Sequence, residues 1–141
     1  METKRVLVVD GQGGGIGKSI IEKIRREQLT GFELIAVGTN ALATAAMLKA
    51  GADAAASGES AVIWNSRKAT WIIGAIGIIA AGSMYGELST GMAEAIAGSD
   101  AMKILIPVNK CHLQIAGITD EPLPLRIEQA VDLLRRQLSA G

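Results

Sequence analysis

Two periodicities of hydrophobic and polar residues alternate along most of the chain. Short, nearly continuous apolar runs are typical of strands that are buried on both faces of a parallel sheet. They lie at 5–9, 32–37, 52–56, 71–74 and 103–108. Segments with helical periodicity or helix-ending signals lie between or after them, at 18–29, 40–49, 60–67, 90–97 and 124–138. This alternation predicts an α/β fold: a three-layer, Rossmann-like, mostly parallel sheet of about five strands.

One short segment departs from this pattern. His112-Leu113-Gln114-Ile115 alternates polar and apolar residues, which is the period of a half-buried strand. We therefore predict an antiparallel strand at the sheet edge. The length of 141 residues and the absence of a linker-like stretch predict a single domain over residues 1–141, a nucleotide-binding one by the argument below.

Glycine is the compositional outlier, with 17 of 141 residues against a usual share of about 7%. Five glycines fall within positions 11–17, between the first strand and the first helix. That position suits a phosphate, because free N–H groups and the helix dipole favour an anion there. We expect the N–H groups of Ile16 to Ser19 to meet the phosphates. Asp10 is expected to accept hydrogen bonds from the loop.

In a parallel α/β sheet, ligands bind beyond the carboxyl ends of the strands. The predicted cofactor-binding residues therefore follow strands one, two and four. They are Gly11, Gln12, Gly13, Gly14, Gly15, Ile16, Gly17, Lys18, Ser19, Thr39, Asn40 and Gly74.

Two loop chemistries are compatible with part of the motif. Gly17-Lys18-Ser19 matches the end of a P-loop, but the first glycine of that motif would fall on Gln12. No aspartate follows strands four and five to anchor Mg²⁺. The longer dinucleotide form, Gly-x-x-x-Gly-x-Gly, fits Gly11, Gly15 and Gly17. In this respect the loop resembles that of the short-chain dehydrogenase/reductase family, whose helix also opens on Gly-Ile-Gly.

The rest of that family's pattern is missing. Its catalytic Tyr-x-x-x-Lys would need a lysine four residues after Tyr85, where Ser89 stands. The acid or arginine that distinguishes NAD from NADP after strand two is replaced by Thr39 and Asn40. The expected cofactor is therefore NAD or NADP, with the choice open, and Asn40 is expected to cap the next helix.

Charge and cysteine content narrow the function classes. The 14 basic and 14 acidic residues balance, which argues against a nucleic-acid partner. The uncharged stretch at 69–86 is near membrane-spanning length, but its glycines divide it into a strand and a turn, so no membrane span is predicted. A single cysteine excludes a multi-cysteine metal site, and no metal is predicted. The start lacks an apolar signal segment, which predicts a cytoplasmic protein.

Candidates for catalysis are few. Cys111, Glu87 and Tyr85 follow predicted strands, and each has a structural interpretation as well. The uncharged segment 76–87 fits either the wall of a ligand site or a subunit contact. The apolar content predicts a homodimer or larger homo-oligomer.

With these residues in view, nearly the whole chain resembles a bacterial family of uncharacterised proteins described as Rossmann-like. The matching stretches are 10–18, 38–44, 47–53, 77–79 with 86–88, and 106–111. This resemblance implies a Rossmann-like fold and no established activity. The function predicted from the residues is a cofactor-binding or sensing module that binds a nucleotide, NAD(P) in particular. The alternatives are a small NAD(P)-dependent oxidoreductase with a site completed at a subunit interface, and a P-loop-like nucleotide hydrolase.

Overall fold

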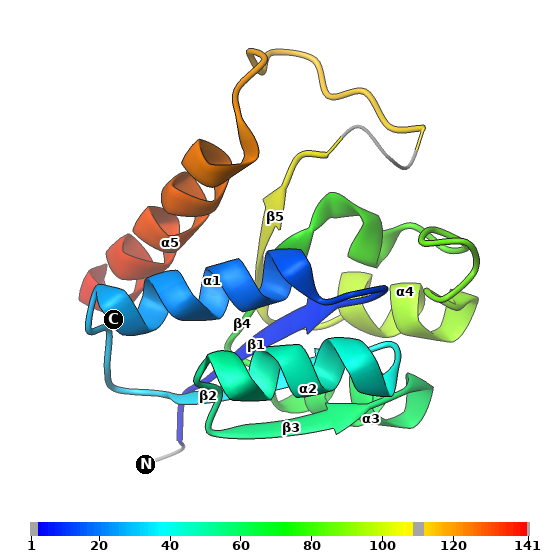
Figure 1. Ribbon diagram of the computed structural model, residues 1–141, viewed down its shortest axis with the longest axis horizontal. Helices are drawn as coiled ribbons and strands as arrows, with labels where there is room; N and C mark the ends of the chain where they lie inside the picture. The colour runs from blue at the N-terminus through cyan, green and yellow to red at the C-terminus, as the bar shows by residue number, and fades with distance from the viewer. Residues whose placement is uncertain (1–2, 109–111, 141) are drawn as a thin grey trace.

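The structure, a computed structural model, describes residues 3–108 and 112–140 and has a five-stranded parallel sheet at its centre (Figure 1). The strand order is β3-β2-β1-β4-β5. The strands are β1 (Arg5–Asp10), β2 (Glu33–Gly38), β3 (Ala54–Ser57), β4 (Trp71–Ala75) and β5 (Met102–Ile106). The helices are α1 (Gly15–Arg26), α2 (Ala41–Ala50), α3 (Glu59–Lys68), the short 3₁₀ helix η1 (Ile76–Ile79), α4 (Thr90–Ala97) and α5 (Leu123–Ala140).

Helices cover both faces of the sheet, which confirms the three-layer prediction. Successive residues of β1 point to opposite faces, so Val6 and Val8 enter one core while Leu7 and Val9 enter the other. The first core is closed by apolar residues of α1, α2 and α5, and the second by those of α3, α4 and η1. The reversal of chain direction between β3 and β4 places the helices before and after it on opposite faces.

The strand order creates a reversal point next to β1. The chain moves outward from β1 through β2 to β3, and then returns to the other side of β1 to form β4 and β5. The register aligns Val6, Leu7 and Val8 with Trp71, Ile72 and Ile73. The connections that leave β1 and β4 therefore diverge, which opens a crevice at the carboxyl ends of these strands.

Local helix signals behave as the sequence predicts, with one shift in position. Asn40 caps α2, because its side-chain oxygen accepts a hydrogen bond of 2.8 Å from the Ala43 N–H. Helix α1 starts at Gly15, three residues before the predicted start. Its cap is Gly14 in the left-handed conformation, with no side-chain hydrogen bond. The glycine-rich motif is thus divided between loop and helix.

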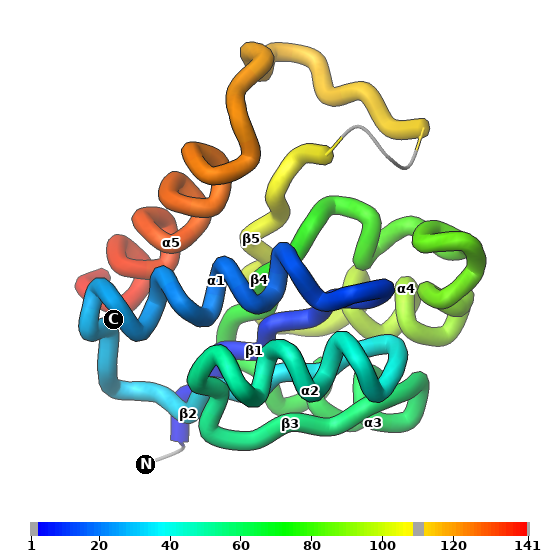
Figure 2. The backbone as a smooth tube through the Cα atoms, viewed as in Figure 1, coloured from blue at the N-terminus to red at the C-terminus, as the bar shows by residue number. Residues whose placement is uncertain are grey.

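The predicted antiparallel edge strand is wrong. Residues 113–115 form no strand, and all four strand pairings among the described residues are parallel. Residues 112–122 pass outside the layered body between β5 and α5, as the backbone trace shows (Figure 2). Leu113 and Ile115 are partly exposed there. A four-residue alternation specifies a strand only when a free sheet edge lies within hydrogen-bonding reach, and this segment is led away from the sheet.

No helix in the described part of the chain is both long enough and apolar enough to cross a bilayer. The uncharged stretch that approaches spanning length is divided between β4, η1 and the turns after it.

Candidate functional site

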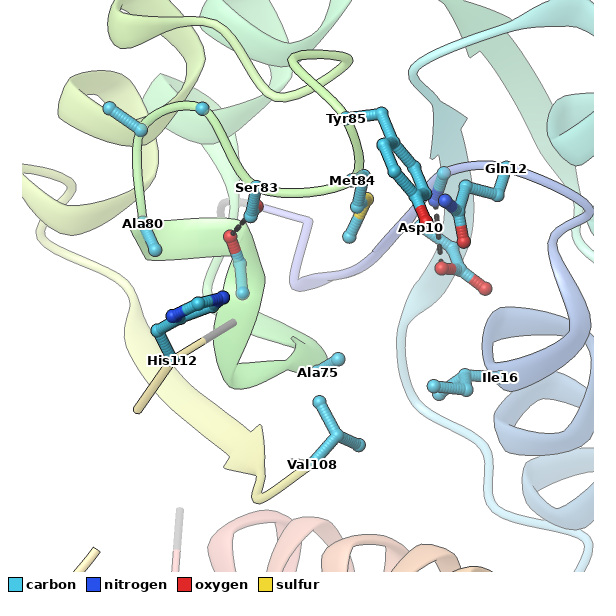
Figure 3. A pocket seen from close by; sticks show the side chains of 14 residues that line it. Asp10, Gln12, Ile16, Ala75, Ala80, Ser83, Met84, Tyr85, Val108 and His112 are labelled. Atoms are coloured by element: carbon cyan, nitrogen blue, oxygen red, sulfur yellow. Dashed lines mark hydrogen bonds between the residues drawn. The ribbon is translucent and has the colours of Figure 1, made fainter. Parts of the chain in front are cut away.

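A cavity of about 800 Å³ opens at the reversal point, beyond the carboxyl ends of β1, β4 and β5. Figure 3 shows Asp10, Gln12 and Ile16 on one side of it and Ala75, Val108 and His112 on the other. Its remaining lining residues belong to the glycine loop and to the segment after β4. They are Gly11, Gly77, Ala80, Ala81, Gly82, Ser83, Met84 and Tyr85. The cavity lies where doubly wound α/β folds bind ligands.

The Asp10 carboxylate organises the loop from beneath. Its two oxygens accept hydrogen bonds from the Gly11 and Gly17 N–H groups, each at 2.7 Å. This confirms the role predicted for Asp10. Only 6% of the residue is exposed. Burial raises the pKa of Asp10, and the hydrogen bonds from the Gly17, Gly11 and Ile16 N–H groups partly offset that effect. The negative charge of Glu87 raises the pKa further.

The expected set of phosphate-binding N–H groups needs a correction. Gly17 donates to Asp10, and Lys18 donates to the Gly14 carbonyl oxygen at 2.9 Å. Both N–H groups are thus engaged within the protein rather than presented to a ligand. The N–H groups of Gly13 and Gly15 have no acceptor among the described residues, and both residues are exposed. The face that the loop offers to an anion is therefore shifted toward its outer turn.

The five glycines of the loop fall into two groups by what a side chain would meet. A Cβ at Gly11 would lie 2.5 Å from Met84 Sδ, and one at Gly14 would lie 2.8 Å from the Ala43 backbone. A Cβ at Gly17 would collide with Met47. We call these three the inner glycines. A Cβ at Gly13 or Gly15 would meet nothing within 4 Å, and we call these two the outer glycines.

Glu87 connects the glycine loop to the end of β2. Its Oε1 accepts hydrogen bonds from the Thr39 hydroxyl at 2.6 Å, the Asn40 amide at 2.8 Å and the Gln12 N–H at 2.9 Å. These donors lower the pKa of Glu87, the Thr39 hydroxyl most of all. The Asn40 amide also donates to the Gln12 carbonyl oxygen at 2.9 Å. The sequence predicts Thr39, Asn40 and Glu87 as separate site candidates, and tertiary structure brings them together.

The segment after β4 forms one wall of the cavity. Ser83 donates a hydrogen bond of 2.6 Å to the Gly77 carbonyl oxygen, which folds the segment back on η1. Ile78 and Leu88 anchor its two ends in the core. Of the two interpretations predicted for this segment, the cavity wall is the one that the geometry supports. Tyr85 is fully exposed at the rim.

Other predicted residues have varied positions. Gly74 is buried, and a Cβ there would lie 2.7 Å from the Val9 carbonyl oxygen, so close packing of β4 on β1 accounts for this glycine. Lys18 is exposed and Ser19 half-buried on the first turns of α1. Cys111 lies outside the described residues. His112 lines the cavity, which the predicted edge strand did not indicate. Within 3–108 and 112–140, no group of three or more metal-ligating acids, histidines or cysteines occurs.

Fold and cavity together define a Rossmann-like α/β protein with a ligand-sized crevice at the reversal point of its sheet. The chain belongs to the family described as "Domain of unknown function (DUF3842)", which matches residues 5–139. This confirms the resemblance to an uncharacterised family. The comparison with curated proteins found no match. The likeness of the loop to short-chain dehydrogenases stays a prediction.

Two solved structures are similar in fold. One, the crystal structure of AibC, is 15% identical with a TM-score of 0.49; the match covers 97% of this chain and 40% of that one. The chain thus spans less than half the length of that protein. The other is a dodecameric FMN-dependent Ubix-like decarboxylase from Escherichia coli O157:H7. It is 15% identical with a TM-score of 0.42, and the match covers 92% of this chain and 76% of that one.

Proposed function

We propose that this protein is a nucleotide-binding module that takes NAD(P) in the cavity at the reversal point. The outer glycines are the observation that carries the proposal. No packing contact within the described structure requires a glycine at Gly13 or Gly15. Glycine at these positions lowers helix stability and chain rigidity without an internal gain. Close approach of a ligand to the backbone accounts for both residues.

The chemistry of the outer turn suits a pyrophosphate. Gly13 and Gly15 present N–H groups with no acceptor among the described residues, and Gly15 is the first residue of a 12-residue helix. The positive end of the helix dipole lies at this turn. Lys18 is exposed one turn into the helix and adds a positive charge. Asp10 is buried beneath the loop, where Gly11 and Gly17 hold its carboxylate on the inner side.

The rest of the cavity suits a planar ring. Its volume of about 800 Å³ lies within the range of about 300–1,000 Å³ found for small-molecule sites. The wall opposite the loop is built from small and apolar residues, among them Ala75, Gly77 and Ala80. Such a wall can pack against a nicotinamide ring without demanding polar partners. Among the catalytic candidates, Glu87 holds the structure of the loop and Tyr85 lies fully exposed at the rim, so we place binding ahead of catalysis.

A thermal-shift panel tests the proposal. The ligands are NAD, NADH, NADP, NADPH, FMN, FAD, ATP, GTP and inorganic phosphate. A ligand at about 100 times its dissociation constant adds about 2.7 kcal/mol to the free energy of unfolding. For a chain of this length that raises the melting temperature by about 5 °C. We expect this shift with at least one nicotinamide dinucleotide.

The matched control is the double variant Gly13→Ala/Gly15→Ala. Because the added methyl groups meet no protein atom, we expect the variant to melt at or above the wild-type temperature without ligand. We expect its ligand-induced shift to be lost. No shift of the wild type with any dinucleotide, or an equal shift in the variant, would refute the proposal. A shift with ATP or GTP alone would favour the hydrolase alternative.

A further inference from the structure

The end of β2 lacks the acid that NAD-binding sheets carry there, yet a carboxylate lies beside it. In dinucleotide-binding folds that acid accepts hydrogen bonds from a ribose hydroxyl. Here Thr39 and Asn40 follow β2, and Glu87 reaches them from the segment after β4. Its Oε1 lies 2.6 Å from the Thr39 hydroxyl oxygen and 2.8 Å from the Asn40 amide nitrogen. The missing acid is thus supplied from a residue 48 positions further along the chain than Thr39.

The two oxygens of Glu87 differ in their surroundings. All three hydrogen bonds to this side chain end on Oε1, which the donors hold in place from the loop and from the end of β2. No described residue donates to Oε2, and the side chain is partly open to solvent. An oriented carboxylate with one free oxygen is suited to accept hydrogen bonds from neighbouring hydroxyls of a sugar.

The charge around Glu87 favours a neutral diol over a phosphate ester. Among the described residues, Glu87 forms no ion pair with a lysine or arginine. The second carboxylate, Asp10, is near enough for the two charges to interact. Two acids without a paired cation repel the two negative charges of a ribose 2′-phosphate. A free 2′-hydroxyl brings no such charge and can donate to Oε2.

We infer that Glu87 receives the ribose hydroxyls of the adenosine half and thereby selects NAD(H) over NADP(H). This inference rests on the proposed nucleotide site, since it names which dinucleotide that site accepts. The free Oε2 next to the glycine loop carries it. The same hydrogen bonds keep the loop and the end of β2 in contact, so Glu87 is both a positioning and a binding residue.

The first test needs no variant. Titrations of the wild type with NADH, with NADPH and with the NADH analogue that lacks the adenosine 2′-hydroxyl are followed by calorimetry. We expect NADH to bind at least tenfold more tightly than either of the other two. Equal affinity for NADH and NADPH, or for NADH and its 2′-deoxy analogue, would overturn the inference while the proposed site stands. No binding of any of the three would overturn the proposed function as well.

The second test uses Glu87→Gln and a matched control, Glu94→Gln. Glu94 is an exposed acid on α4 whose side chain has no hydrogen bond to a described residue, so its loss changes the net charge equally. We expect Glu87→Gln to weaken NADH binding at least tenfold, to leave NADPH binding equal or stronger, and so to narrow the ratio of the two. Glu94→Gln should match the wild type. An unchanged ratio in folded Glu87→Gln would overturn the inference.

Discussion

The inner and outer glycines of one loop perform different tasks, although they alternate within the short stretch 11–17. The inner three, at 11, 14 and 17, face Met84, the Ala43 backbone and Met47. The outer two, at 13 and 15, face open space. A glycine that packs against protein serves the fold, whereas a glycine that faces solvent has no such reason to be there. A dense glycine motif of this kind therefore combines two superimposed signals.

The two carboxylates beneath and beside the loop differ in a parallel way. Asp10 is buried, holds the inner N–H groups and has a raised pKa. Glu87 is partly exposed, holds the outer Gln12 N–H and has a lowered pKa. The buried acid therefore belongs with the inner glycines, and the accessible one is placed to meet a ligand.

The largest expected effect is that of Gly14→Ala. Gly14 has φ of 75°, and a Cβ would lie 2.8 Å from the Ala43 backbone, which cannot move aside as a side chain can. We expect a loss of about 2–5 kcal/mol in the free energy of unfolding, measured by urea denaturation. Gly31→Ala is the matched control, because Gly31 also has a positive φ but no atom near its Cβ position. It should cost about 1–2 kcal/mol. Equal losses in the two variants would mean that the contact with α2 contributes nothing.

An intermediate effect is expected for Asp10→Asn. Asparagine has one side-chain oxygen, so either the Gly11 or the Gly17 N–H loses its acceptor. We expect a loss of about 1–3 kcal/mol in the free energy of unfolding. The loss should depend on pH. Because folding raises the pKa of Asp10, the stability contributed by its protonated form is full below its ordinary value of 3.8. It declines as the pH rises through the raised pKa of the folded state.

Glu87 acts in the opposite direction, because folding lowers its pKa. Its contribution is full above its ordinary value of 4.5 and is lost as the pH falls through the lower value of the folded state. Changes above pH 4.5 therefore do not arise from Glu87. Urea denaturation of wild type and Asp10→Asn between about pH 3 and pH 7 checks both signs. The stability advantage of the wild type should shrink with rising pH, and an advantage that grows would contradict the raised pKa of Asp10.

The smallest expected effect on stability is that of Gly15→Ala. Alanine restricts the unfolded chain and meets no atom in the folded state, so we expect a gain of about 0.4–1 kcal/mol. The same variant is expected to bind NADH more weakly, measured by calorimetry, because the methyl group stands where the phosphate approaches. A variant that is destabilised, or one that binds as tightly as the wild type, would remove the distinction between inner and outer glycines at this position.

Much of the fold was predictable because it follows from local patterns. Buried runs such as 71–74 predict parallel strands by composition alone, and Asn40 predicts a helix cap by its chemistry. The role of Asp10 was also predictable, because its donors lie within seven residues of it. The edge strand at 112–115 was not, since four alternating residues carry too little information about whether a sheet edge is within reach.

The sequence by itself determined the strand-helix alternation, the glycine loop between the first strand and helix, and the acid at its start. These features depend on residues close together in the chain, where backbone geometry and hydrogen bonding act locally. Only the tertiary structure decided which glycines pack against protein and which face open space, and which carboxylate accompanies the end of β2. Thr39 and Glu87 are 48 residues apart, and their contact depends on the sheet order that returns the chain past β1. No local periodicity records a contact of that kind, because it arises from the packing of whole elements.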